Sequence, residues 1–205
     1  TLTADATLRS TTGAINVTTI TDGAGSYTLS LGEADNQTGT ITFSGNVTVN
    51  TLETFSSDYD IAFEGIANVI DINTIFANTG GLTFGNDSDD TITFNGGLSA
   101  DAGGTITLFG KLYSSNDAIS LQNLTLDGNS EIHTAATDAT GSLTIGTITG
   151  ASKDLILDAG SAGAISVGQV DALGNLTVTD SATTTFTGTV AAVNVLLSNS
   201  TTITF

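Results

Sequence analysis

The sequence contains no proline, cysteine, methionine or tryptophan, and only one histidine and three lysine or arginine residues among its 205. A typical chain of this length has about ten prolines, so their complete absence needs a structural explanation. The lack of cysteine excludes disulfide scaffolds, iron–sulfur clusters, thiolate zinc sites and thiol nucleophiles. A single histidine excludes multi-histidine metal sites, and three cations are too few for a nucleic-acid-binding surface.

Acidic residues dominate the charge, because 21 aspartates and glutamates against three cations give a net charge of −18. Only 12% of the residues are charged and the mean hydropathy is +0.23, which is not the composition of a disordered chain. Threonine, serine and asparagine supply most of the polarity and favour strands and turns. No apolar run approaches the length of a membrane-spanning helix. Because the chain begins at Thr1 without methionine and stops in a strand-like run at Phe205, we expect it to be a segment of a longer polypeptide.

A short pattern of apolar, polar and apolar residues recurs along the chain and is often followed by glycine. It reads Ile-Thr-Phe-Ser-Gly at 41–45, Ile-Ala-Phe-Glu-Gly at 61–65 and Ile-Thr-Phe-Asn-Gly at 92–96. Successive copies start between 19 and 31 positions apart. The nine copies start at Ile15, Ile41, Ile61, Ile92, Ile119, Leu143, Ile165, Thr184 and Ile203. A second strand-like run lies between most copies, so each unit is expected to hold two or three short strands.

Units of this length cannot bury a core alone, but stacked units can. Alternation of apolar and polar residues gives each strand an inward and an outward face. We therefore predict an all-β fold, a right-handed parallel β-helix of about eight to nine coils of roughly 19–31 residues. The starting residues should form one inward column, with Thr184 as the exception. Residues 1–205 should form a single solenoid, with irregular coils over 1–118 and regular coils over 119–205. A pair of immunoglobulin-like sandwiches is the competing fold.

The predicted solenoid explains the missing proline and gives the glycines a role. Proline would remove a ladder hydrogen bond from almost any strand that has neighbours on both sides. The glycines after the motif are expected to adopt positive φ at the corners between strands. They are Gly45, Gly65, Gly96, Gly146, Gly168 and Gly188.

The stretch from Asp154 to Val178, DLILDAGSAGAISVGQVDALGNLTV, and its continuation to Leu197 resemble the repeats of filamentous-haemagglutinin-type bacterial exoproteins and related adhesins. The similarity is clear over residues 119–205 and weaker before them. The resemblance implies a right-handed parallel β-helix that acts as a stalk or adhesive fibre at a bacterial surface. The amino-terminal secretion domain of that family is not recognisable in this sequence.

An acidic turn at 85–93, Gly-Asn-Asp-Ser-Asp-Asp-Thr-Ile-Thr, resembles one copy of a calcium-binding nonapeptide repeat. Asp87, Asp89 and Asp90 would supply the hard oxygen ligands that Ca²⁺ prefers. Because such motifs work in tandem arrays and this copy stands alone, the alternative is a solvated acidic turn. Calcium is the only ion that we predict, and we expect no other cofactor.

Other chemistry-bearing residues give no motif. His133 follows Ile132 in a predicted strand, so it should point outward if Ile132 points inward. Tyr27, Tyr59 and Tyr113 would form a sugar-stacking platform only if they shared a face, and their different places in the repeat argue against it. The cations needed by a lyase acting on acidic sugars are far apart in the sequence, and paired carboxylates for a hydrolase arise easily by chance among 21 acids.

These observations predict a structural protein without enzymatic activity: a stalk, filament or adhesin segment of a large secreted or cell-surface bacterial protein. Its expected partners are other copies or flanking domains of the same protein, and host or matrix glycans, but not nucleic acid. Lateral self-assembly is a further possibility. The alternative function is a carbohydrate-binding or carbohydrate-degrading β-helix, which an exposed cluster of aromatic or acidic side chains on one face would favour.

Overall fold

The computed structural model describes residues 1–23, 25–32, 36–101, 104–135 and 137–205. Its secondary structure in these ranges consists of strands, without any helix. The strands are β1 (Ala6–Leu8), β2 (Ala14–Val17), β3 (Ile20–Thr21), β4 (Thr28–Leu31), β5 (Thr40–Phe43), β6 (Val47–Val49), β7 (Thr51–Thr54), β8 (Asp60–Phe63), β9 (Ala67–Ile70), β10 (Thr74–Ile75), β11 (Leu82–Phe84), β12 (Thr91–Phe94), β13 (Leu98–Ala100), β14 (Ile106–Ser114), β15 (Ile119–His133), β16 (Leu143–Thr149), β17 (Leu155–Asp158), β18 (Ala164–Val178), β19 (Ser181–Phe186), β20 (Val190–Leu197) and β21 (Ser200–Thr204).

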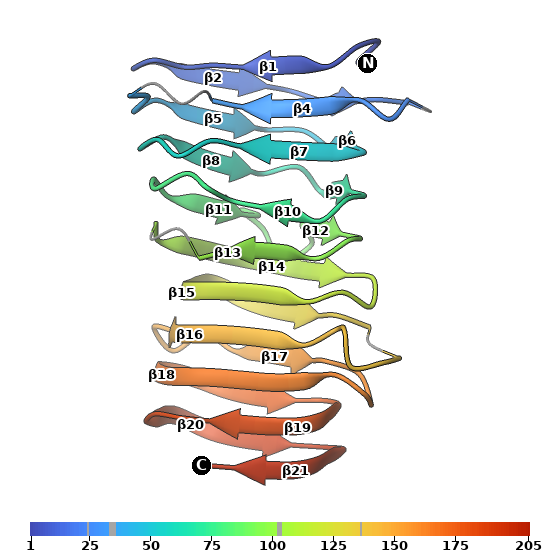
Figure 1. Ribbon diagram of the computed structural model, residues 1–205. Coiled ribbons are helices and arrows are strands. Elements are labelled where there is room, and N and C mark those ends of the chain that lie inside the picture. The colour runs from blue at the N-terminus through green and yellow to red at the C-terminus, as the bar shows by residue number, and fades with distance from the viewer. Residues whose placement is uncertain (24, 33–35, 102–103, 136) are drawn as a thin grey trace.

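The chain winds into a right-handed parallel β-helix of about nine turns, which confirms the predicted fold. Each turn has three faces, and strands pair in parallel with strands of the turns before and after. Figure 1 shows the stack running from the amino terminus at one end to the carboxyl terminus at the other. Paired residues are separated by one turn of chain, from 18 positions (Ile106 to Leu124) to 27 positions (Ile20 to Val47).

Three faces follow one another in every turn. The first face holds β1, β4, β7, β10, β13, the starts of β15, β16 and β18, and then β19 and β21. The second face holds β2, β5, β8, β11, the start of β14, the middle of β15, the end of β16, the middle of β18 and the start of β20. The third face holds β3, β6, β9, β12, the end of β14, the end of β15, β17, the end of β18 and the end of β20. The longest strands turn corners, and β15 runs along all three faces.

The predicted inward column is correct in parts but combines residues from different faces. Ile15, Ile41 and Ile61 pair in register on the second face, but Ile61 then pairs with Leu82 and not with Ile92. Ile92 lies on the third face. The residues from Ile119 onward, namely Ile119, Leu143, Ile165, Thr184 and Ile203, pair in register on the first face. The error has a physical reason: all three strands of a turn carry the same alternation, so the motif does not identify its face.

Phenylalanine fills the core in the first half of the stack. Phe43 and Phe63 stack with ring centroids 5.1 Å apart, and Phe63 stacks on Phe84 at 6.1 Å. Phe76 lies on another face of the turn and meets Phe84 edge-to-face, with ring centroids 5.7 Å apart. All four rings are buried. The column continues with aliphatic side chains, because Phe84 pairs with Leu108 and Leu108 with Leu126. One apolar core therefore runs along the axis of the solenoid.

The motif glycines lie at corners between strands, but the reason predicted for them was wrong. None of the six has positive φ. They are required by close stacking instead: a methyl group at Gly168 would lie 2.2 Å from the carbonyl oxygen of Gly146, and one at Gly188 would lie 2.5 Å from that of Gly168. Gly65 faces the backbone of Gly45 in the same way. Glycine at these corners lets successive turns approach each other.

The hydrogen-bonded ladder of the first face is interrupted between β7 and β10. Strands β1, β4 and β7 form a three-stranded sheet of their own, while β10 pairs with β13 in the large sheet. Thr54 bridges the interruption, since its Oγ1 donates to the carbonyl oxygen of Ile75 at 3.2 Å and accepts from the amide of Ala77 at 2.7 Å. The interruption falls within the region for which irregular coils were predicted.

Candidate functional site

The acidic turn between β11 and β12 is closed by its own carboxylates. Asp90 is only 5% exposed, and its Oδ2 accepts hydrogen bonds from the amides of Asn86 at 2.8 Å and Asp87 at 3.1 Å. Oδ1 of Asp87 accepts from the amide of Asp89 and the hydroxyl of Ser88, both at 3.2 Å. Asp89 itself is exposed. Two of the three predicted ligands thus stabilise the loop through its own backbone.

Calcium binding by Asp87, Asp89 and Asp90 therefore stays a prediction. Among the described residues, no group of three or more acidic, histidine or cysteine side chains is arranged to hold a metal ion. Thermal unfolding in calcium and in chelator tests the prediction directly. A higher melting temperature in calcium would support it, and identical curves would contradict it.

The third face carries a cluster of polar side chains that the sequence did not reveal as a group. Lys111 and Tyr113 in β14 lie in register with Glu131 and His133 in β15, and His133 lies in register with Asp158 in β17. We call these five residues the third-face cluster. They point outward because the alternate residues Leu112, Ile132 and Leu157 are buried in the core. Parallel pairing thus stacks five polar side chains with four kinds of functional group over three successive turns.

Contacts between neighbouring turns hold this cluster together. The rings of Tyr113 and His133 meet edge-to-face, with centroids 5.7 Å apart and planes at 88°. The Tyr113 hydroxyl donates a hydrogen bond to the Glu131 carboxylate. Nε2 of His133 lies 3.7 Å from Oδ1 of Asp158, and the His133 side chain is 34% exposed. The four side chains form a continuous line of contacts, with Lys111 beside it on the same two strands.

Tyr113 has a perturbed pKa because of this environment. Burial, the charge of Glu131 and the hydrogen bond to Glu131 raise its pKa from 10.0 to about 12. Deprotonation is therefore harder in the folded state, so the stability linked to Tyr113 is present below pH 10 and is lost as the pH rises towards about 12. We expect Glu131→Gln to lower the pKa of Tyr113, measured as tyrosinate absorbance in difference titrations with Tyr113→Phe as the blank. An unchanged Tyr113 pKa in Glu131→Gln would show that Glu131 does not raise it.

A shallow depression of about 260 Å³ adjoins the cluster at the corner between the second and third faces. Its wall includes Ser88 from the acidic turn, Lys111, Asn129, Glu131, Asp154 and Ile156. Its polar rim is held in place across turns. Oδ1 of Asn129 accepts from the Asp154 amide at 3.0 Å, and Oδ1 of Asp154 accepts from the backbone and side-chain amides of Asn175 at 2.7 and 2.8 Å.

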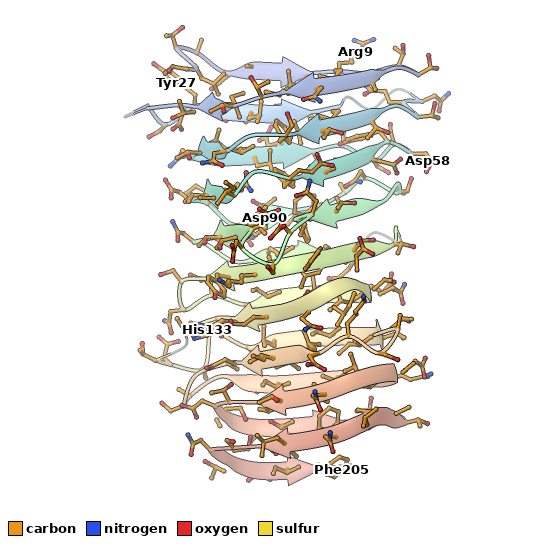
Figure 2. All side chains as sticks on the ribbon, turned by 180° about the vertical axis from the view of Figure 1, so that it is seen from behind. Arg9, Tyr27, Asp58, Asp90, His133 and Phe205 are labelled. Carbon is orange, nitrogen blue, oxygen red and sulfur yellow. The ribbon has the colours of Figure 1, made fainter. Side chains whose placement is uncertain are left out.

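Of the histidine and the three tyrosines singled out from the sequence, His133 and Tyr113 belong to this cluster, and Tyr27 and Tyr59 lie apart from it. His133 points outward as predicted, with Ile132 buried beneath the same strand. The three tyrosines do not share a face: Tyr59 is buried, and its hydroxyl donates to the carbonyl oxygen of Leu31 at 2.5 Å. Burial also raises the pKa of Tyr59. Figure 2 shows Tyr27 near one end of the stack, and Asp90 and His133 in its middle turns.

The signal for the cluster was present in the sequence as a spacing. Lys111 and Glu131 are 20 positions apart, and so are Tyr113 and His133, which equals one turn of chain in this part of the stack. That spacing has meaning only once the register is known. The described part of the chain has no helix long and apolar enough to span a membrane. No family model, curated protein or solved structure matches the chain.

Proposed function

We propose that the chain is a rigid structural segment of a larger secreted or cell-surface protein, acting as part of a stalk, filament or adhesin body. The observation that supports this most is the continuous apolar core, which includes residues from Leu29 near the first turns to Phe186 near the last. Each turn covers the apolar face of its neighbour, so no turn is an independent folding unit. A rod of about nine turns has a length of roughly 40 Å at about 4.8 Å per turn.

The parallel ladders support a mechanical role. Inner strands such as β16 are hydrogen-bonded to a turn on each side, and the pairing continues in register around the corners. Bending the rod requires these ladders to stretch together on one side. The surface charge of −18 keeps such rods apart from each other, from nucleic acids and from anionic membranes.

The last described turn leaves apolar side chains of the inward columns partly exposed. Val195 and Ile203 continue inward columns but are each 41% exposed, whereas Leu176 beneath Val195 is fully buried. Phe205 stacks on Phe186 at 5.3 Å and is 75% exposed. We propose other copies or flanking solenoid repeats as the partners.

The proposal is tested in the organism that produces the protein. Intact cells labelled with antibodies against residues 1–205 should be positive without permeabilisation, because we propose a surface location. An in-frame deletion of residues 1–205 should shorten the surface fibre seen by electron microscopy by roughly 40 Å while leaving it displayed. Labelling only after permeabilisation, or fibres of unchanged length, would contradict the proposal.

A further inference from the structure

We propose that the third-face cluster and the depression beside it bind a neutral glycan, with the Tyr113 and His133 rings facing a pyranose ring and Lys111, Glu131 and Asn129 meeting its hydroxyl groups. This inference goes beyond the structural role and does not depend on it. It assigns a recognition surface to one face of the rod.

The composition of the cluster sets it apart from the rest of the chain. The sequence has only three tyrosines, one histidine and three lysine or arginine residues, and one member of each class lies on two adjacent strands of the third face. The outward residues in register with them one turn earlier are Thr91 and Thr93. A plain threonine surface therefore changes into an aromatic and charged one within a single turn.

The chemical groups match what a sugar requires. Pyranose rings present apolar C–H faces that pack on aromatic rings, and their hydroxyls both donate and accept hydrogen bonds. Tyr113 and His133 supply two rings, a carboxylate of Glu131 accepts, and the Lys111 ammonium donates. Among the residues that the structure describes, the Lys111 side chain has no hydrogen-bond or ion-pair partner, so its donors are open to a ligand. The depression of about 260 Å³ lies just below the usual range for ligand pockets, so it has room for no more than a single sugar ring.

Charge favours a neutral glycan over an acidic one. Glu131, Asp154 and Asp158 lie in or beside the site, against one ammonium group from Lys111. The whole chain carries −18. A uronate carboxylate entering the site would meet this negative field, whereas a neutral sugar would not.

The site is also organised before a ligand arrives. Its side chains project from paired strands, and the line of contacts from Glu131 through Tyr113 and His133 to Asp158 restricts their rotamers. Binding therefore loses little side-chain entropy. Sites carried by strands hold their geometry better than sites carried by loops.

Titration calorimetry with neutral hexasaccharides of the glucan, mannan, xylan and galactan types, and with oligogalacturonate as the acidic probe, tests the inference. We expect at least one neutral hexasaccharide to bind, and oligogalacturonate to bind more weakly or not at all. Tyr113→Ala should weaken binding at least tenfold and Lys111→Ala several-fold. Thr93→Ala, in register with Tyr113 one turn earlier, is the matched control and should bind as the unchanged protein does.

Several outcomes would overturn the inference. The inference would be wrong if no neutral probe bound, or if oligogalacturonate bound more tightly than every neutral probe. It would also be wrong if Tyr113→Ala bound with the same affinity as the unchanged protein. Release of shorter sugars during incubation would show that the site cleaves the glycan, which would contradict a role in binding alone. Tyr113→Ala removes a half-buried ring and should lower the melting temperature, so each variant is titrated at a temperature where its circular dichroism matches that of the parent, which separates a lost site from a lost fold. Tyr113→Phe keeps the ring, so retained binding in that variant would assign the interaction to the ring, as we propose.

Discussion

Replacing Phe63 by alanine is expected to lower the free energy of unfolding by about 3–5 kcal/mol. The Phe63 ring is fully buried and stacks between Phe43 at 5.1 Å and Phe84 at 6.1 Å, with Phe76 edge-on at 6.4 Å. Its strand β8 is held in register by β5 on one side and β11 on the other, so the turns cannot close over the cavity. Urea unfolding followed by circular dichroism measures the loss.

Phe205→Ala is the matched control for this prediction. Phe205 also stacks on a phenylalanine, Phe186, at 5.3 Å, but it is 75% exposed and lies on the last turn. We expect its removal to change stability by less than about 1 kcal/mol, because little area leaves water there. If Phe63→Ala and Phe205→Ala lowered the free energy of unfolding equally, the inner column would stabilise the fold no more than a surface contact does. That result would contradict the role assigned to the core.

The sequence was sufficient to predict the class of fold, its parallel pairing and the inward or outward direction of many side chains. Each of these follows from local alternation and from the repeat, which act over a few residues and over one turn. The assignment of residues to faces did not follow, because Ile61, Ile92 and Ile119 stand in equivalent local patterns but lie on three different faces. Face identity depends on corner lengths, and the corners differ from turn to turn.

The candidate site could not be predicted from the sequence for the same reason. His133 could be placed on the surface from the burial of Ile132, which is a local inference. Its neighbours Tyr113 and Asp158 lie one turn before and one turn after it, at separations of 20 and 25 positions. Because turn length varies, neither separation by itself predicts contact. The acidic turn at Asp87 and Asp90 was visible in the sequence, but the capture of its carboxylates by backbone amides was not.

The corner glycines give the second large effect, because their role is steric. Gly168→Ala would place a methyl carbon 2.2 Å from the carbonyl oxygen of Gly146. That oxygen belongs to the backbone of the neighbouring turn and cannot rotate away, so relief requires the two turns to separate. Overpacking in a tight interior costs about 1–3 kcal/mol, and we expect Gly168→Ala to reach about 3 kcal/mol or more. Chemical denaturation measures the change in the free energy of unfolding.

Gly13→Ala adds the same methyl group at a glycine that precedes β2 and should have the opposite effect. An added methyl carbon there meets no atom within 4 Å, and Gly13 does not have positive φ. Alanine at such a position stabilises a protein by about 0.4–1 kcal/mol, because it restricts the unfolded chain. If Gly168→Ala were instead neutral or stabilising, the glycines would not be needed for close approach of the turns. Opposite signs for one chemical change would show that stacking distance, and not backbone conformation, selects glycine at these corners.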